Sequence, residues 1–316
     1  MSNKIPIFFD ASALKNASCF RHFWRSVVQG YKSKGKEARG HAMAYGSGIH
    51  KFLEVLYKGG TKRDGLQVAL DYYTPWDKTL NLTNFEFRTA SNLLKVCNKY
   101  HRVFLSNDKL DFTPLTDKDG KKLVEYKFSV KIWENDTYIL YLAGTIDLIC
   151  EYEGYTNLIV DHKSTSVRED HGKFFSQYDW DIQPMLYSKV WREANGLDNY
   201  PPVLINGIFV KKPTKKAEEA GGMFDGVEFD RSGVIEYDDD RMSKFTDWLN
   251  KRVKSIIYYL ENPLLNPLDN YEMAACKSIY GTCPFFGVCK LPEEYQASAL
   301  EQEFEIIKYN PLKFRD

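Results

Sequence analysis

The chain has 316 residues, 43% of them hydrophobic, so it can bury a substantial core as one large domain or two modest ones. Its 43 Lys and Arg residues equal its 43 Asp and Glu residues in number, so the chain lacks the net positive charge that many nucleic-acid-binding proteins carry. The amino terminus lacks a signal-like apolar core, and no stretch reaches the roughly 18 apolar residues of a membrane span. We therefore expect a soluble cytoplasmic protein without membrane contact, in which clustered cysteines bind metal rather than form disulfides.

The first third of the chain is predicted to be mostly helical. Aromatic and aliphatic residues recur at helical spacing in residues 10–31, 46–57 and 84–104. The glycine pair Gly59-Gly60 ends the second of these segments. A charged loop separates the first helix from the second.

The pattern changes to strands after residue 122. Residues 123–133, 138–152 and 157–164 are rich in β-branched and aromatic side chains and are separated by short polar turns, which predicts a three-strand meander. Residues 178–194 are expected to form a helix that ends at Asn195-Gly196.

The remaining third is predicted to hold two strands and a long helix. The strands are expected at residues 203–212 and 226–237, and the helix at residues 238–260. The lysines of the loop after residue 210 form the densest basic run and are candidates for phosphate contact, although a solvated loop explains them equally well: Lys211, Lys212, Lys215 and Lys216.

Two acids and a lysine are expected on one face of the meander. If the turn between the second and third strands is centred on Gly154, the numbers of paired residues sum to twice 154, which is 308. Asp147 then lies opposite Asp161. Lys163 follows two residues later, so its side chain shares that face. Paired carboxylates suit Mg²⁺ or Mn²⁺, and a nearby ammonium can stabilise developing charge. This combination is typical of phosphodiester hydrolysis, whereas a lone DxK tripeptide is usually an ordinary surface charge cluster.

The segments GTIDLI and LIVDHKS resemble the signature of RecB-type PD-(D/E)XK nucleases. The resemblance implies Asp147, Asp161 and Lys163 as catalytic residues, with Asp147 and Asp161 also binding the metal ion. The segment GSGIH is similar to the helix start that supplies a histidine ligand in this family, which implies His50 as the third ligand. Glu54 lies one helical turn further on, where it could hold the second nitrogen of that histidine or be plain surface charge.

Two further residues are implied by the same resemblance. The family carries a glutamine and a tyrosine four residues apart after the lysine strand, and QPMLY supplies Gln183 and Tyr187, which would position DNA. Because Pro184 follows directly, Gln183 could instead be a helix cap. Glu125 stands where relatives have an acid on the first strand, but a single acid on a strand is weak support.

Four cysteines resemble the iron-sulfur staple of AddB-type and CRISPR-associated spacer-acquisition nucleases. The resemblance implies that Cys19 joins three cysteines near the other end of the chain to hold a [4Fe-4S] cluster: Cys276, Cys283 and Cys289. Zinc is the alternative occupant, since four thiolates also suit it. Such a staple closes a long loop and constrains segments that bury little apolar surface.

The fold expected is α/β, a restriction-endonuclease-like mixed sheet flanked by helices. A single nuclease unit would span residues 1–316, with its core at about 43–260 and residues 262–292 joining Cys19 in the staple. The expected function is a Mg²⁺- or Mn²⁺-dependent DNA exonuclease of recombination, repair or phage DNA metabolism, in a bacterial or phage-infected cell, with a helicase or recombination partner. The alternatives are a CRISPR spacer-processing nuclease and a non-catalytic DNA-binding module of the same fold.

Overall fold

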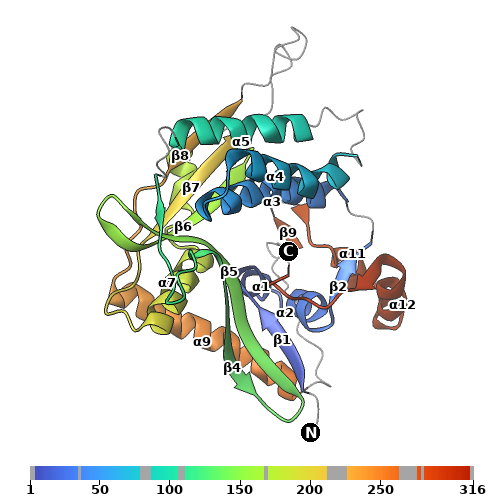
Figure 1. Ribbon diagram of the computed structural model, residues 1–316. Helices are drawn as coiled ribbons and strands as arrows, with labels where there is room; N and C mark the ends of the chain where they lie inside the picture. Colours follow the sequence, from blue (N-terminus) through green and yellow to red (C-terminus); the bar gives the residue numbers. More distant parts are fainter. Residues whose placement is uncertain are drawn as a thin grey trace. The chain divides into compact units, whose positions relative to one another are not determined.

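The computed structural model describes most of the chain, and it divides into two compact units (Figure 1). The described residues are 4–34, 37–78, 87–105, 111–166, 170–211, 226–262, 276–278 and 281–313. Unit 1 comprises residues 1–36, 127–145 and 239–316, and unit 2 comprises residues 37–126 and 146–238. Two long strands, β4 (Val124–Glu134) and β5 (Tyr138–Tyr152), run from one unit into the other.

Unit 2 is built on a mixed sheet. The order of its strands is β5, β6 (Tyr155–Thr165), β7 (Val203–Val210) and β8 (Val227–Arg231), and β3 (Thr113–Pro114) and β4 also pair with β5. β6 is antiparallel to β5 and parallel to β7, while β8 is antiparallel to β7. The sheet and its flanking helices confirm the predicted mixed α/β class, and the meander of β4, β5 and β6 is present as expected.

Helices of unit 2 cover both faces of this sheet. On one face, α3 (Glu37–Tyr57), α4 (Lys62–Asp77) and α5 (Ala90–Phe104) share a buried core with Leu158 and Val160 of β6 (Figure 1). On the other face, α7 (Ile182–Asn195) contacts Asn157 and Lys163, which alternate with those core residues along the strand. A short helix, α6 (His171–Ser176), precedes α7.

The β5–β6 hairpin has the predicted register, but it reaches that register through a bulge. Tyr152 pairs with Tyr155 across a two-residue turn whose residues both have positive φ, 47° at Glu153 and 86° at Gly154. A register shift follows, with Asn157 in the left-handed region at φ 56°. Beyond the shift, Leu148 pairs with Val160, and the two numbers sum to the expected constant. Asp147 directly precedes Leu148 in the chain, and Asp161 directly follows Val160.

Unit 1 collects both ends of the chain. Strand β1 (Ile5–Phe9) pairs in parallel with the first half of β5. Strand β2 (Tyr31–Ser33) pairs with β11 (Phe304–Ile306), so segments far apart in sequence are held together. The other elements of this unit are α1 (Ala11–Asn16), α2 (Phe20–Phe23), the π-helix η1 (Trp24–Val28), α9 (Asp239–Glu261), β9 (Lys277–Ser278), β10 (Gly281–Thr282), α11 (Phe286–Cys289) and α12 (Glu293–Glu303).

One prediction for the first third of the chain was wrong, and one helix there was not predicted. The single helix over residues 10–31 is divided, because Cys19 adopts an extended conformation (φ −118°, ψ 107°) between α1 and α2, and Gly30 has φ 77°. Helix α4 was not predicted, because Gly65 and Pro75 interrupt its helical pattern. Gly65 has a packing role that spacing does not reveal: a Cβ there would lie 2.9 Å from Phe52 of α3.

One prediction for a later segment also needs correction. The strand expected at residues 226–237 ends at Arg231, after which only a single bridge joins Val203 and Ile235. Most of the basic run, from Lys212 to Lys216, lies outside the described residues, and Lys211 forms an ion pair with Glu228. Within the described part of the chain, no helix combines the length and apolar composition that a bilayer crossing needs.

Candidate functional site

His50 is presented to the site by the last two turns of α3. Its helical neighbours Ile49, Phe52 and Leu53 are all almost completely buried in the core of unit 2. Because these side chains fix the rotation of the helix, the imidazole projects in a defined direction. The Nδ1 atom of His50 is buried and makes no hydrogen bond to any residue that the structure describes.

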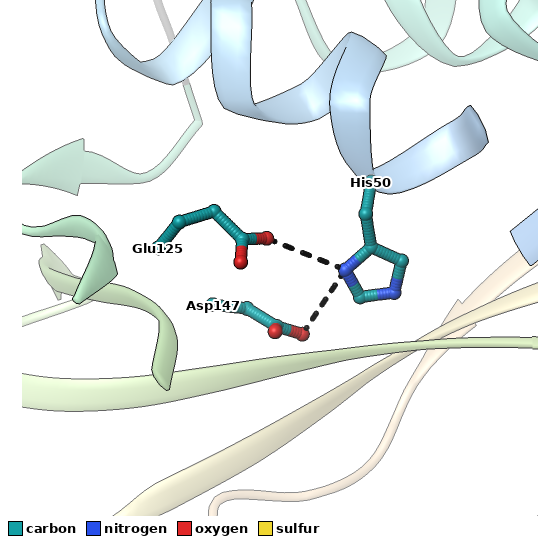
Figure 2. Close-up of side chains that lie close together, drawn as sticks. All are labelled: His50, Glu125 and Asp147. Carbon is teal, nitrogen blue, oxygen red and sulfur yellow. Dashed lines mark ion pairs between the residues drawn. The ribbon is translucent and has the colours of Figure 1, made fainter. Parts of the chain in front are cut away.

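Two carboxylates face that nitrogen. Figure 2 shows Glu125 and Asp147 pointing toward the imidazole of His50. Oε1 of Glu125 lies 3.6 Å from Nδ1, and Oδ2 of Asp147 lies 3.5 Å from it. One ligand atom from each residue falls within 4.8 Å of the others. An imidazole nitrogen and two carboxylate oxygens are a donor set that fits a divalent cation such as Mn²⁺ or Mg²⁺.

Glu125 is a member of this cluster although it was not among the predicted site residues. Its backbone has φ 51°, in the left-handed region that residues with a Cβ rarely adopt. Such a conformation costs on the order of 1–3 kcal/mol and persists where the surrounding structure imposes it, often at functional sites. In the sequence Glu125 was only one acid on a strand, and neither its conformation nor its neighbours could be read there.

Asp161 and Lys163 lie side by side on β6, as the strand period predicted. Nζ of Lys163 is 2.9 Å from Oδ1 and 2.7 Å from Oδ2 of Asp161, whose side chain is almost fully buried. The cluster around His50 consists of Glu125 and Asp147, while Asp161 makes these contacts with the lysine. Metal binding by Asp161 therefore stays a prediction.

The next strand residue connects the two groups. The backbone amide of His162 donates to Oδ2 of Asp147 at 2.8 Å, so β6 holds the carboxylate that faces His50. A hydrogen bond to a charged acceptor is about twice as strong as a neutral one, which makes this contact an effective clamp on Asp147.

Gln183 and Tyr187 are brought to Lys163 by α7. Oε1 of Gln183 accepts a hydrogen bond from Nζ of Lys163 at 3.0 Å, and its amide nitrogen donates to the hydroxyl of Tyr187 at 2.9 Å. The helix cap is Asp181, whose carboxylate accepts from the backbone of Gln183. Pro184 is compatible with this arrangement because residues of the first helical turn need no donor. Gln183 is therefore inside the helix, and not its cap.

The side chain of His162 belongs to a buried polar network, and its ring centroid lies 5.9 Å from that of His50. Its Nδ1 atom lies 2.9 Å from the side-chain amide nitrogen of Asn206, a fully buried residue. A side-chain amide nitrogen can only donate, so Nδ1 of His162 accepts this hydrogen bond. The same amide nitrogen donates to the hydroxyl of Tyr100 at 3.0 Å, and that hydroxyl lies 3.0 Å from the hydroxyl of Tyr57. Burial is the largest cause that raises the pKa of both tyrosines, so both remain neutral donors.

A partly buried ion pair ends this network. Arg231 of β8 pairs with Asp111, and Asp111 also accepts from the hydroxyl of Tyr57 at 3.2 Å. Burial by itself would lower the pKa of Arg231, but the charge of Asp111 together with contacts to Tyr100 and Tyr152 outweighs burial, and the pKa is raised. The guanidinium lies over the rings of Phe112 and Phe104, 4.3 and 4.5 Å from their centroids. The network thus begins at His162, the residue whose backbone amide holds Asp147.

Glu54 does not reach His50. Its carboxylate pairs with Lys58 at 2.5 Å and with Lys51 at 3.4 Å on the outer surface of α3. Burial alone would raise the pKa of Glu54, but these two lysines together lower it. Of the two alternatives left open by the sequence, a partner of His50 or a surface charge, Glu54 is therefore the surface charge.

The four cysteines of the expected staple all lie in unit 1 and none forms a disulfide: Cys19, Cys276, Cys283 and Cys289. Burial is the largest cause that raises the pKa of the Cys283 thiol, and repulsion from the other three thiols raises it further. The other three cysteines therefore all lie within electrostatic reach of Cys283. Cys283 and Cys289 also border a small core of Phe285, Val288 and Phe304.

An arginine approaches one of these thiols. Nη1 of Arg25 lies 3.2 Å from Sγ of Cys289, and Nη2 donates to Oε1 of Gln296 at 2.6 Å. Arg25 is almost completely buried and its guanidinium lies 5.7 Å from the ring centroid of Phe285. A fixed cation at this position favours the thiolate form that metal binding requires.

The arrangement of an acid, an acid-x-lysine strand and a helix histidine agrees with a comparison against known families. Residues 12–290 match the model of the PD-(D/E)XK nuclease superfamily. The chain belongs to this superfamily. A crystal structure described as a "putative exonuclease" from Eubacterium rectale is similar over 93% of both chains, with 14% sequence identity and a TM-score of 0.44. Comparison with curated proteins found no similar sequence.

PD-(D/E)XK nucleases use divalent metal ions, and this chain supplies suitable ligands. The cluster of His50, Glu125 and Asp147 offers one nitrogen and two oxygen donors within 4.8 Å of one another. The buried Nδ1 of His50, which has no hydrogen bond to any described residue, is the kind of atom that a metal ion would satisfy.

Proposed function

We propose that this chain is a metal-dependent deoxyribonuclease that hydrolyses phosphodiester bonds at DNA ends. The observation that supports it most is the hydrogen bond from the amide of His162 to Asp147, because it joins the carboxylate cluster to the Asp161–Lys163 strand in one site. We further propose that it acts in recombination, repair or phage DNA metabolism, beside a helicase or recombination partner.

Each residue has a distinct role in this proposal. His50, Glu125 and Asp147 would hold Mg²⁺ or Mn²⁺, with Asp161 as a further ligand. When bound, such an ion polarises a phosphoryl oxygen and lowers the pKa of a water molecule that can attack phosphorus. Lys163 is held by Asp161 and Gln183. Its positive charge would stabilise the negative charge that develops on the five-coordinate phosphoryl group in the transition state.

The test uses linear and covalently closed DNA. Wild-type protein with Mg²⁺ or Mn²⁺ is expected to degrade end-labelled linear single- or double-stranded DNA and to spare closed circles of the same sequence. Lys163→Ala and Asp161→Ala should each lower kcat by on the order of 100-fold or more. Lys58→Ala is the matched control, because Lys58 is also paired with a carboxylate, on the surface of α3.

Other outcomes would change the proposal in defined ways. Cleavage of closed circles at the same rate as linear DNA would make the enzyme an endonuclease. Failure of metal-loaded wild-type protein to cut any DNA would contradict the proposal, and equal activity of Lys163→Ala and Lys58→Ala would remove Lys163 from the site.

We also propose that four cysteines of unit 1 hold a [4Fe-4S] cluster: Cys19, Cys276, Cys283 and Cys289. Support comes from the other three cysteines lying within electrostatic reach of Cys283 and from the guanidinium of Arg25 beside Cys289. Anaerobically purified protein should absorb broadly near about 400 nm and contain iron and sulfide in equal amounts. Cys283→Ala should lose this absorption, whereas Cys97→Ala, a cysteine buried in unit 2, should keep it. A colourless protein with one zinc ion per chain would contradict the cluster.

A further inference from the structure

Lys163 has a third neighbour besides Asp161 and Gln183. Its Nζ atom lies over the ring of Tyr178, 5.9 Å from the ring centroid. An ammonium within about 6 Å of the face of a tyrosine ring is attracted by the negative potential of that face. Tyr178 was not among the predicted site residues, because nothing in the sequence indicates that its ring meets the lysine.

The ring restrains the ammonium without competing for its hydrogens. Oδ1 of Asp161 and Oε1 of Gln183 accept hydrogen bonds from Nζ of Lys163 at 2.9 and 3.0 Å. A further oxygen acceptor at this place would compete with a phosphoryl oxygen for the donors of the ammonium. A ring face attracts the whole cation instead, so it limits the movement of Nζ and leaves its donors to the substrate.

The ring of Tyr178 is held by the turn that follows α6. The backbone amide of Tyr178 donates to the carbonyl of Phe175 at 2.9 Å. Its ring meets the ring of Phe174 in an edge arrangement, with 5.5 Å between the centroids. Both phenylalanines are buried. The position of the tyrosine ring therefore depends on how α6 packs on the sheet.

Helix α6 packs on the sheet at Gly207. In the parallel pairing of β6 and β7, Gly207 is the partner of Lys163, so a side chain at position 207 would lie on the same face as the lysine. A Cβ there would lie 2.9 Å from the ring of Phe175 and 2.7 Å from the ring of Phe209. Both distances are shorter than a normal carbon–carbon contact. The missing side chain of Gly207 therefore makes room for Phe175 beside the strand position of Lys163.

The first residue of α6 is also fixed to the sheet. The imidazole of His171 stacks on the ring of Phe209, with 3.8 Å between the centroids and 15° between the planes. Its Nδ1 atom lies 2.8 Å from Oδ2 of Asp230, and its Nε2 atom lies 3.4 Å from Oε2 of Glu228. Helix α6 is therefore held at its first residue as well as at Phe175, which fixes the turn that carries the tyrosine.

We propose that Tyr178 is a positioning residue for Lys163. The face of its ring holds the ammonium where it meets the scissile phosphoryl group, and Gly207 is the place at which α6 docks to bring the ring there. The inference rests on the proposed nuclease function, because the role of Lys163 in catalysis does. The contact between the ring and the ammonium is measured separately, without DNA cleavage.

The contact is measured by NMR in protein whose lysines carry carbon-13 at Cε. An aromatic ring shifts the signals of protons above its face upfield, and the signal of Lys163 is identified by its loss in Lys163→Met. Tyr178→Leu should move this signal downfield, whereas Tyr178→Phe should leave it close to the wild-type position. Gly207→Ala should also move it downfield, because a Cβ at position 207 displaces Phe175 and with it the turn.

The catalytic role is measured with linear DNA and Mg²⁺. Tyr178→Leu should lower kcat by about 3- to 10-fold, the loss expected for one cation–ring contact, and should change KM less. Tyr178→Phe should retain the wild-type kcat. Trifluorophenylalanine at position 178 keeps nearly the shape of phenylalanine but weakens the negative potential of the ring face, so kcat should fall toward the leucine value. This comparison also tests the contact if the leucine variant fails to fold.

The matched control is another cation–ring contact of unit 2. The guanidinium of Arg192 lies 4.1 Å from the ring centroid of Tyr200. Tyr200→Leu removes this contact and should change neither kcat nor the NMR signal of Lys163.

The results distinguish this inference from the function on which it rests. If wild-type protein cleaves DNA and the kcat of Tyr178→Leu equals that of Tyr200→Leu, the positioning role is overturned and the nuclease stands. Equal kcat for phenylalanine and trifluorophenylalanine at position 178 overturns the attraction by the ring face. An unchanged Lys163 signal in Gly207→Ala overturns the docking role of Gly207. If no DNA is cut but the signal moves in Tyr178→Leu, the contact is supported and the nuclease proposal fails.

Discussion

The backbone amide of His162 donates a hydrogen bond to Oδ2 of Asp147 at 2.8 Å, and the same oxygen lies 3.5 Å from Nδ1 of His50. The residue between Asp161 and Lys163 thus positions a carboxylate on the neighbouring strand. Its own ring is in turn held by Asn206, 2.9 Å away. Stability and metal binding should therefore respond together when this contact is changed.

Asn206→Leu removes the donor for His162 and leaves buried polar atoms without partners. We expect a loss of about 1–3 kcal/mol in the free energy of unfolding. We also expect about 10-fold weaker Mn²⁺ binding, in the range found when groups behind metal ligands are changed. Urea unfolding and Mn²⁺ titration measure the two effects. Tyr100→Phe, which removes one hydroxyl but keeps the His162–Asn206 contact, should lose stability with little change in Mn²⁺ affinity. Equal Mn²⁺ affinity in wild type and Asn206→Leu would limit the network to a structural role.

Gln183 should matter more than Tyr187 for catalysis. Gln183→Met removes the acceptor that holds Nζ of Lys163, so kcat should fall by about 10- to 100-fold. Tyr187→Phe removes only the group that orients Gln183 and should lower kcat by a few-fold. Steady-state assays on labelled linear DNA test this order. Lys189→Ala, which breaks a surface pair with Glu193 on the same helix, is the control and should leave kcat unchanged. A larger effect from Tyr187→Phe would reverse the assigned roles.

The stability of variants at Asn157 should depend on how well the new residue tolerates the backbone conformation there. Its φ of 56° lies in the left-handed region, and its side chain accepts from the indole of Trp191 at 3.1 Å. Asn157→Gly relieves the backbone and loses that bond, whereas Asn157→Ala loses the bond and keeps a Cβ in the strained region. We expect the alanine variant to be less stable than the glycine variant by about 1–2 kcal/mol in urea unfolding.

Deletion of Asn157 tests the bulge itself. Loss of one residue would shift the register of β6 by one and turn Asp161 to the opposite face from Asp147. The deletion should abolish nuclease activity, whereas both point variants should retain it. A deletion variant with wild-type activity would show that the bulge does not set the register of the catalytic residues.

Unit 1 should lose stability in mild acid through His22. Burial lowers the pKa of His22 to about 4 from its usual value of 6.5. The unfolded chain binds a proton at a higher pH than the folded chain, so the free energy of unfolding falls as pH decreases from about 6.5 to 4. The contribution of this one group is at most about 3 kcal/mol.

The measurement compares urea unfolding of wild type and His22→Gln at pH 7 and pH 4.5. Acid also protonates cysteine thiolates, but it does so in both proteins, so the difference between them isolates the histidine. His22→Gln should show a smaller loss on acidification. Parallel pH profiles for the two proteins would mean that His22 does not remain neutral in the folded state.

Much of the strand that carries Asp161 and Lys163 could be predicted from the sequence. Asp161 and Lys163 share a face because a strand repeats every two residues, and Gln183 and Tyr187 share a face because a helix repeats every 3.6. These relations are set by covalent geometry within one element, so they hold wherever the element packs. For the same reason the hairpin around Gly154 could be placed from its apolar runs and its turn.

Tertiary structure decided which elements meet. It brought Glu125, in a backbone conformation that no local pattern indicates, against His50, which lies 75 positions earlier in the chain. It paired Glu54 with lysines, and it placed Asn206 behind His162. These contacts join segments far apart in sequence, and their formation depends on how side chains fill a shared core. The sequence by itself determined the chemistry of the acids and the lysine, and packing determined which groups surround them.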